Sequence, residues 1–156
     1  MKRPYKALLF VLASELAGNV GTIFTISAIP TWYATLTKPW FTPPNWLFAP
    51  VWLILFALMG VAAYLVYERG MKNAEARIAI YAFCAQFGLN VLWSALFFGL
   101  RSPLLGMAGI IALWMAILAT IVLFYRVSRR AAYLLVPYIA WVSIAAALNY
   151  SIMALY

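Results

Sequence analysis

The sequence predicts an all-α integral membrane protein: a bundle of five transmembrane helices with a long Trp/Pro-rich first loop acting as a lid. Hydrophobic residues make up 68% of the 156-residue chain and charged residues only 9%. Soluble domains average about 45–50% apolar and about 25% charged residues. In addition, five apolar runs are each long enough to cross a hydrocarbon core of about 30 Å as a helix.

The five predicted spans lie in one transmembrane domain, residues 1–156, at about residues 6–29, 46–67, 78–98, 103–125 and 131–154. Backbone groups in lipid must bond to each other, so we expect every span to be a helix. The basic start followed by an apolar run resembles a signal peptide. The apolar run continues past Glu15, however, which stands where cleavage after Ala17 would need a small residue, so we expect the first span to be retained.

Cap and turn signals separate the spans. Thr42 followed by proline predicts the N-cap and first turn of the second helix. Gly70 and Asn73 interrupt the chain after that helix, and Ser102 followed by proline restarts it before the fourth span. Within the first connector, Thr31 could cap one short helical turn.

The net charge of +8 is explained by membrane topology rather than by nucleic-acid binding, because the basic residues gather in short segments between spans. Nine of them fall on one predicted side: Lys2, Arg3, Lys6, Arg69, Lys72, Arg77, Arg126, Arg129 and Arg130. The other side has Lys38 and Arg101. The positive-inside rule therefore predicts a cytoplasmic N-terminus, with the C-terminus and the first loop on the outer side.

The first connector and the start of the second span, residues 32–52, carry four of the seven tryptophans and four of the eight prolines. Proline fixes φ and removes a donor, so this stretch cannot be one regular helix. Long ordered connectors tend to be functional, and indole rings suit a membrane interface or a flat ligand. We interpret the stretch as the lid and mouth of a binding site.

The third span places Gln86, Asn90, Trp93 and Phe97 on one helix face. Amides inside a span need partners or a polar cavity. They either form hydrogen bonds between helices, which are common, or make an aromatic pocket wall with an amide anchor. In the fifth span, small Ala145 lies one turn after Trp141 and leaves room beside the indole.

Glu15 is the only acid within a predicted span, and Asn19 lies one turn later. No Lys or Arg within a span can pair with it, so we expect a neutral carboxyl hydrogen-bonded to an amide. A proton relay is the alternative, but it would need further titratable groups at the same depth.

Small residues recur every four positions in the first span, at Ala13, Ala17 and Gly21 and at Ser14 and Gly18, and in the third at Cys84 and Gly88. Such faces allow close helix contact within a subunit or between two. We predict a homodimer through the first and third helices, broken by Gly18→Ile.

The residue types that are missing exclude several chemistries. The chain has no histidine, three acidic residues and one cysteine. It therefore cannot build a histidine-based triad or an internal disulfide, and a zinc or di-iron site is not expected. We expect no required cofactor and no metal.

The stretch W-Y-A-T-L-T-K-P-W-F-T-P-P-N-W-L-F-A-P-V-W resembles the first-loop motif of the translocator protein family, also called the tryptophan-rich sensory protein or peripheral benzodiazepine receptor group. The resemblance extends over nearly the whole chain. Its further motifs are Met59-Gly60, Tyr64-Leu65-Val66, Asn90 with Trp93, Pro137-Tyr138, Trp141 and Leu148-Asn149-Tyr150.

The resemblance implies a five-helix bundle, often dimeric, with a cavity under the first loop that binds protoporphyrin IX, other tetrapyrroles or benzodiazepine-type drugs. Trp52 and Trp141 match the tryptophans that line this cavity and are implicated in porphyrin breakdown. Asn90 and Trp93 match its third-helix wall, with Phe56 one turn beyond Trp52.

The same resemblance makes Trp32 and Tyr33 the loop residues that close over the cavity. Lys38 could meet a porphyrin propionate at the mouth. Haem iron would want His, Cys or Met, so the lack of histidine favours metal-free porphyrin. Cholesterol is not expected, because no basic residue follows Leu148 and Tyr150 as the animal pattern requires.

Three functions remain open. The leading hypothesis is a membrane porphyrin-binding sensor or regulator. The second is a light- and oxygen-dependent porphyrin-degrading enzyme that uses Trp52 and Trp141 as electron donors. The third is a porphyrin or lipid transporter, which the odd number of spans and the lack of a visible internal repeat make less attractive.

Overall fold

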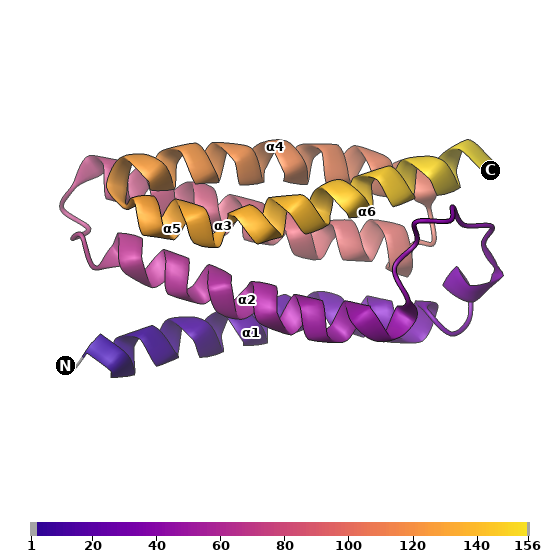
Figure 1. Cartoon of the computed structure of the whole chain (residues 1–156), viewed down its shortest axis with the longest axis horizontal. Coiled ribbons are helices and arrows are strands. Elements are labelled where there is room, and N and C mark those ends of the chain that lie inside the picture. The colour runs from indigo at the N-terminus through magenta and orange to yellow at the C-terminus, as the bar shows by residue number, and fades with distance from the viewer. Residues whose placement is uncertain (1–2, 156) are drawn as a thin grey trace.

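A computed structural model describes residues 3–155 of the chain, and it is helical throughout apart from its connecting segments. Five of its helices are long and apolar enough to cross a membrane. The predicted fold class is therefore confirmed, and the protein is a multi-pass integral membrane protein with five candidate spans (Figure 1).

The helices follow the apolar runs in chain order. They are α1 (Arg3–Ala28), the short 3-10 helix η1 (Tyr33–Thr35), α2 (Asn45–Tyr67), α3 (Ala74–Ser94) with its π-helical extension η2 (Ala95–Gly99), α4 (Pro103–Val127), α5 (Arg129–Leu134) and α6 (Val136–Leu155). The fifth span is made of α5 and α6 together.

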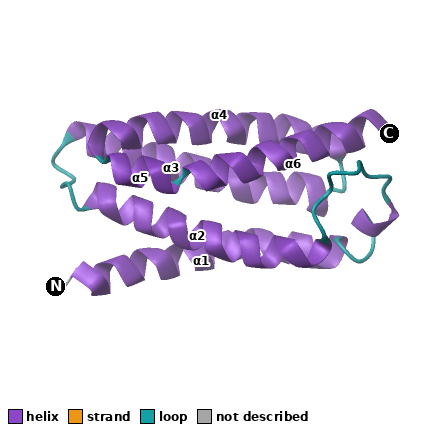
Figure 2. Ribbon diagram, viewed as in Figure 1, coloured by secondary structure: helices purple, strands orange, loops and turns teal. Residues whose placement is uncertain are grey.

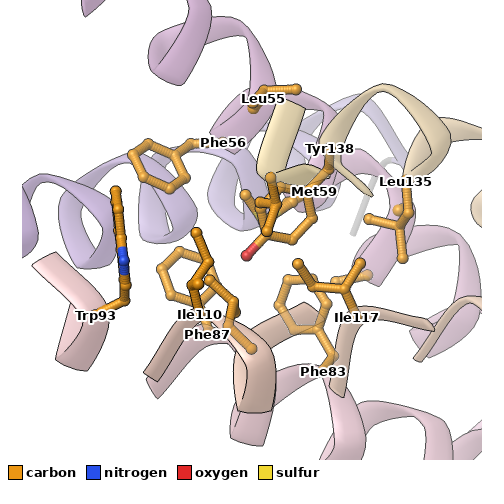
Figure 3. Close-up of a cluster of buried hydrophobic side chains, with 14 of the residues drawn as sticks. Leu55, Phe56, Met59, Phe83, Phe87, Trp93, Ile110, Ile117, Leu135 and Tyr138 are labelled. Carbon is orange, nitrogen blue, oxygen red and sulfur yellow. The ribbon is translucent and has the colours of Figure 1, made fainter. Parts of the chain in front are cut away.

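The spans pack as a closed ring around an aromatic core. α1 contacts α2 and α3, α3 contacts α4, α4 contacts α5 and α6, and α5 contacts α2. Figure 3 shows the core side chains that α2, α3 and α6 contribute, among them Phe56, Phe83, Phe87, Trp93 and Tyr138.

The two ends of the bundle differ in what they carry. The N-terminus and the α2–α3 connector lie at one end in Figures 1 and 2, together with the α4–α5 corner. The long first loop and the C-terminus lie at the other end. This arrangement matches the alternation of connectors that the basic residues predicted.

The fifth span is interrupted at Leu135, between α5 and α6. The sequence predicted one continuous helix here. Pro137 has no N–H to donate to the carbonyl one turn earlier, and its ring crowds that carbonyl. The Leu135 N–H instead donates to the Ala132 carbonyl, three residues earlier, at 3.1 Å. The Ile139 N–H then donates to the Leu135 carbonyl at 3.1 Å, which restarts the regular helix.

The restart predicted at Ser102 is confirmed by an N-cap, and Asn73, where the sequence predicted only a break in the chain, also caps a helix. The N-cap predicted at Thr42 is wrong. The Asn73 side chain accepts the Glu75 N–H at 2.9 Å, and Ser102 accepts the Leu105 N–H at 3.1 Å. Thr42, however, does not cap α2, which begins at Asn45. Its hydroxyl donates to the Pro39 carbonyl at 2.6 Å, because the following prolines delay the helix.

The short turn expected in the first loop exists as η1, but it begins after Trp32 and Thr31 does not cap it. The Thr31 hydroxyl donates backward to the Ser27 carbonyl at 2.6 Å. This bond ties the start of the loop to the last turn of α1.

α1 is the most weakly enclosed of the spans. Only 17% of its apolar window is buried inside the chain, against 44% for α2. The backbones of α1 and α2 approach each other closely at Gly60, where an added Cβ would lie 2.6 Å from the Cα of Val11. A side chain at this position would therefore separate the two helices.

Candidate ligand-binding cavity

A cavity of about 230 Å³ lies between α1, α2 and α3 on the side of the bundle toward the first loop. Three of the eight predicted ligand-binding residues line it: Trp52, Phe56 and Asn90. The other five predicted residues surround it at a greater distance or belong to the packed core.

Trp52 and Phe56 provide the flat apolar wall. They lie one turn apart on α2 with stacked rings, 5.3 Å between centroids. Phe56 stacks in turn on Phe87 of α3 at 5.7 Å, and the edge of Tyr138 meets Trp52 at 6.3 Å. The rings of Phe56 and Tyr138 therefore hold the indole of Trp52 in position, and the indole also borders the cavity.

Asn90 combines the two roles that the sequence left open. Its Nδ2 donates to the Tyr138 hydroxyl at 2.7 Å, and that hydroxyl donates to Oε1 of Gln86 at 2.7 Å. The amide of Gln86 also lies 4.0 Å from the sulfur of Met59. The amides do join helices, as the simpler interpretation held, and Asn90 also lines the cavity.

Trp93 is buried in the core beside the cavity and does not line it. Its ring stacks on Phe97 at 5.6 Å, and its Nε1 donates to Oδ1 of Asn149 at 3.2 Å. The same Asn149 donates through Nδ2 to the Pro103 carbonyl at 2.7 Å. This side chain links α3, α4 and α6.

Trp141 and Ala145 lie half-buried on α6 and also stand outside the cavity lining. The Trp141 ring meets the ring of Phe48 edge-on at 5.9 Å between centroids. Phe48 itself lines the cavity. The structure thus places Trp141 one ring away from the space that Trp52 borders.

The first loop inserts Tyr33 into the end of the bundle. This side chain is only 1% exposed, and its ring contacts Phe48 at 6.1 Å and Phe98 at 5.8 Å. Trp32 beside it is half-buried, with its ring 5.3 Å from that of Phe97. The two loop residues cover the aromatic core at the end of the bundle that carries the first loop, and they do not line the cavity.

The hydroxyl of Tyr33 has no hydrogen-bond partner among residues 3–155, although it is buried. Burial also raises the pKa of this phenol to about 12, because the charged phenolate would lose its hydration. An unpaired donor costs free energy, so this hydroxyl is suited to meet a polar group of a guest or a water molecule.

Lys38 holds the loop rather than facing the mouth. Its ammonium donates to the carbonyls of Tyr33 at 2.8 Å and Leu36 at 3.1 Å, and it lies 4.7 Å from the Tyr33 ring centroid. The idea that Lys38 meets a propionate therefore competes with these bonds, which fix the conformation of the loop.

The contribution of α1 was missed from the sequence. Gly18, Gly21, Thr22 and Thr25 line the cavity, whereas the small residues of this span were interpreted as a dimer contact. A Cβ on Gly18 would overlap the Phe56 ring, so Gly18 packs inside the subunit and Gly18→Ile would not isolate a dimer contact. The threonines were an available signal, because small hydroxyl side chains on one helix face suit a cavity wall.

Glu15 stands apart from this site. The Asn19 side chain donates to the Glu15 backbone carbonyl at 2.7 Å, so it does not serve the carboxyl. One carboxyl oxygen is buried with no partner among residues 3–155. No three potential metal ligands of the histidine, cysteine, aspartate or glutamate type gather anywhere in this described range.

The comparisons with known proteins agree with this architecture. A family model described as the TspO/MBR family matches residues 10–155. The chain belongs to the TspO/MBR family. The expected resemblance is thereby confirmed over almost the whole chain, including the first loop and the cavity-lining parts of α1, α2 and α3.

Several known proteins are similar to this chain over most of its length. The tryptophan-rich protein TspO of Archaeoglobus fulgidus is 46% identical over 96% of both chains. The same-named protein of Chlorobaculum tepidum is 46% identical over 88% of this chain and 87% of its own. The human translocator protein is 37% identical over 94% of this chain and 87% of its own.

Proposed function

We propose that the chain is a membrane porphyrin-binding sensor or regulator of tetrapyrrole levels, which also accepts planar drug-like ligands of the benzodiazepine type. The observation that carries the proposal is the stacked pair Trp52 and Phe56 on the wall of a cavity between helices. Ligand sites are mostly apolar and aromatic with a few polar groups, and Asn90 supplies such a group here.

A porphyrin requires the cavity to widen. Its volume of about 230 Å³ lies below the range of about 300–1,000 Å³ that is usual for drug-sized ligands. α1 forms one wall and is the least enclosed span. Displacement of α1 or of the loop that follows it would enlarge the space without breaking the α3–α6 hydrogen bonds.

Titration of the purified protein with protoporphyrin IX, haem and cholesterol tests the proposal, with binding followed through the Soret band for the porphyrins. We expect protoporphyrin IX to bind at least as tightly as haem and cholesterol not to bind. Trp52→Ala should weaken porphyrin binding about two- to tenfold, since a ring-on-ring contact contributes about 0.5–1.5 kcal/mol.

Trp46→Ala is the matched control, because this indole is 71% exposed and lies outside the cavity. Its affinity for protoporphyrin IX should equal that of the unaltered protein. Equal losses in the two variants, or no saturable binding in either, would remove the basis for a porphyrin site at Trp52.

Light-driven porphyrin degradation is the second candidate, favoured by the contact of Trp141 with Phe48 beside the cavity. In such a reaction an indole would give one electron to the photoexcited ring, and dioxygen would be the final oxidant. Illumination with protoporphyrin IX should then yield a product spectrum that disappears in Trp52→Phe and Trp141→Phe. If porphyrin bleaches at the rate of free ligand with the unaltered protein and with both variants, the protein binds porphyrin but does not degrade it.

The orientation we propose has the N-terminus in the cytoplasm, with the first loop and the C-terminus on the outer side. Nine of the eleven basic residues belong to the N-terminal side of the predicted topology. In a Cys84→Ala background, Trp40→Cys should react with an impermeant maleimide added to intact cells and Lys72→Cys should not. The reverse pattern would invert the topology.

A homodimer through α1 and α3 belongs to the same proposal. Ala13, Ala17, Cys84 and Gly88 border an apolar groove of about 430 Å³ on the outer face of these helices. An added Cβ at Gly88 would meet nothing within 4 Å. Gly88→Trp should therefore leave the folded monomer intact and abolish the crosslinked dimer, whereas a persistent dimer would place the contact elsewhere.

A further inference from the structure

A second and larger cavity lies at the end of the bundle opposite the first loop. Its volume is about 840 Å³, and its walls carry four arginines: Arg69, Arg126, Arg129 and Arg130. This end holds the N-terminus, the α2–α3 connector and the α4–α5 corner in Figure 1. We call this space the basic cavity.

The arginines of the basic cavity come from two distant parts of the chain. Arg69 follows α2, and the other three lie at the α4–α5 corner, which packs against α2. Lys72 and Arg77 belong to the same end of the molecule but do not line the cavity. The fold thus gathers four arginines around one cavity. An excess of positive charge at this end of the molecule would not by itself bring them together.

Opposing charges offset only part of this potential. Glu68 is the one acidic residue on the cavity wall, and the C-terminal ends of α2 and α4 each contribute about half a negative charge through their last carbonyls. Together these groups balance about two of the four positive charges, so the basic cavity keeps a clear preference for anions.

The residue type and the local geometry favour phosphate among anions. All four cations are arginine, whose planar guanidinium donates two parallel hydrogen bonds to phosphate oxygens. The Arg129 guanidinium lies 5.4 Å from the Tyr125 ring centroid, which restricts its motion. The Ser128 hydroxyl on the same wall accepts the Ala131 N–H at 3.4 Å and can still donate its own hydrogen.

We propose that the basic cavity binds a phosphate-bearing anion, and that its source is the headgroup of an anionic membrane phospholipid. The lipid source is favoured because Leu65 and Val127 add apolar surface to the wall, at the ends of two membrane spans. The volume lies within the range of about 300–1,000 Å³ for ligand pockets. This site is separate from the Trp52 cavity and does not depend on porphyrin binding.

Native mass spectrometry of the purified full-length protein in detergent tests the proposal by counting bound lipids. The probes are phosphatidic acid and phosphatidylcholine at equal concentration. We expect phosphatidic acid to form a saturable one-to-one adduct and phosphatidylcholine to bind much more weakly. Arg126→Gln with Arg129→Gln should weaken the phosphatidic acid adduct about 25-fold, at about fivefold for each arginine near a membrane surface.

Lys72→Gln with Arg77→Gln is the matched control, since it removes the same charge from the same end of the molecule outside the basic cavity. Its phosphatidic acid affinity should change less than about twofold, because neither side chain lines the basic cavity and salt weakens the attraction between exposed charges that are not in contact. If the first double variant does not fold, Arg69→Gln from the opposite wall replaces it, with an expected loss of about fivefold.

Competition with inorganic pyrophosphate separates the two sources of phosphate. Retention of phosphatidic acid in the presence of equimolar pyrophosphate supports the lipid headgroup. Displacement that disappears in the arginine variant supports the phosphate site and assigns it a soluble anion instead. Equal losses in the cavity and control variants, or equal binding of phosphatidic acid and phosphatidylcholine, would overturn the proposal.

Discussion

The two sides of the aromatic core are held together in different ways. On the α3–α6 side, the amides of Gln86, Asn90 and Asn149 form hydrogen bonds with Tyr138 and Trp93 across helices. On the α1–α2 side, the described contacts are those of Gly18 with the Phe56 ring, of Gly60 with the Val11 backbone and of the Phe10 ring with the rings of α2, and the cavity lies there.

This difference indicates which part of the bundle can adapt to a ligand. Directional bonds in a low-dielectric core lose much of their energy when partners move by an ångström or two. Contacts of glycine with a ring have no such directional requirement. We therefore expect the α3–α6 side to stay fixed and α1 to move when the cavity is filled.

The largest effect should come from Trp93→Ala, which attacks the fixed side. The substitution removes a buried indole and leaves the Asn149 amide without its donor. Replacement of a buried large aromatic residue by alanine typically costs about 3–5 kcal/mol. Unfolding in detergent with increasing SDS would measure the loss. A cost no larger than that of Trp46→Ala would show that the α3–α6 side is not the rigid one.

The next effect should come from paired alanine substitutions at Gly18 and Gly88. A methyl at Gly18 overlaps the Phe56 ring, whereas one at Gly88 meets nothing within 4 Å. Gly18→Ala should lose about 1–3 kcal/mol through overpacking, and Gly88→Ala should be neutral or slightly stabilising because alanine favours helix. Unfolding measured on both variants gives the difference. Equal stabilities would mean that α1 already moves freely away from α2.

A smaller cost is expected for Tyr138→Phe. The hydroxyl links Asn90 to Gln86, and its loss breaks two hydrogen bonds while the aromatic ring remains. Side-chain hydrogen bonds in membrane helices contribute on average about 0.6 kcal/mol and at most about 1.7 kcal/mol. The loss should be additive with Gly18→Ala, because the two variants act on different sides of the core. Strong coupling between them would contradict that separation.

The smallest effect is a local one, in the docking of the first loop at high pH. Burial raises the pKa of Tyr33 to about 12 from its usual 10. The released phenol ionises first, so the docked loop has its full stability below about pH 10 and loses it progressively toward pH 12. Proteolysis of the loop between pH 9 and pH 11 should therefore increase. Tyr33→Phe is the control, and its docking should not change in this way.

The membrane fold was predictable because its signals are long and redundant. Each span has 23 to 27 residues of high mean hydropathy, and Asn73 and Ser102, where the sequence indicated a break and a restart, each cap a helix with a side-chain bond. The buried face of α3 was equally predictable, because its residues follow helical spacing along one side. All four of them are buried: Gln86, Asn90, Trp93 and Phe97.

The details of the cavity were less predictable, because they depend on which helices become neighbours. Gly18 could serve a contact within a subunit or between two, and only its position opposite Phe56 decides for the former. The family resemblance implied a cavity-lining role for Trp141 as well as for Trp52, yet Trp141 contacts Phe48, which lines the cavity, and does not line it itself. No local pattern reveals that Phe48 will line the cavity and Trp141 will not.

The π-helical turn at the end of α3 has a consequence for the whole chain that follows it. The N–H of Leu100 reaches back five residues to the Ala95 carbonyl at 2.8 Å. Such a turn holds one residue more than an α-helical turn and so changes the rotational phase of later residues by about 100°. Deletion of a single residue between Ala95 and Gly99 would therefore restore a shorter helix and turn the exit toward α4 to another azimuth around the helix axis.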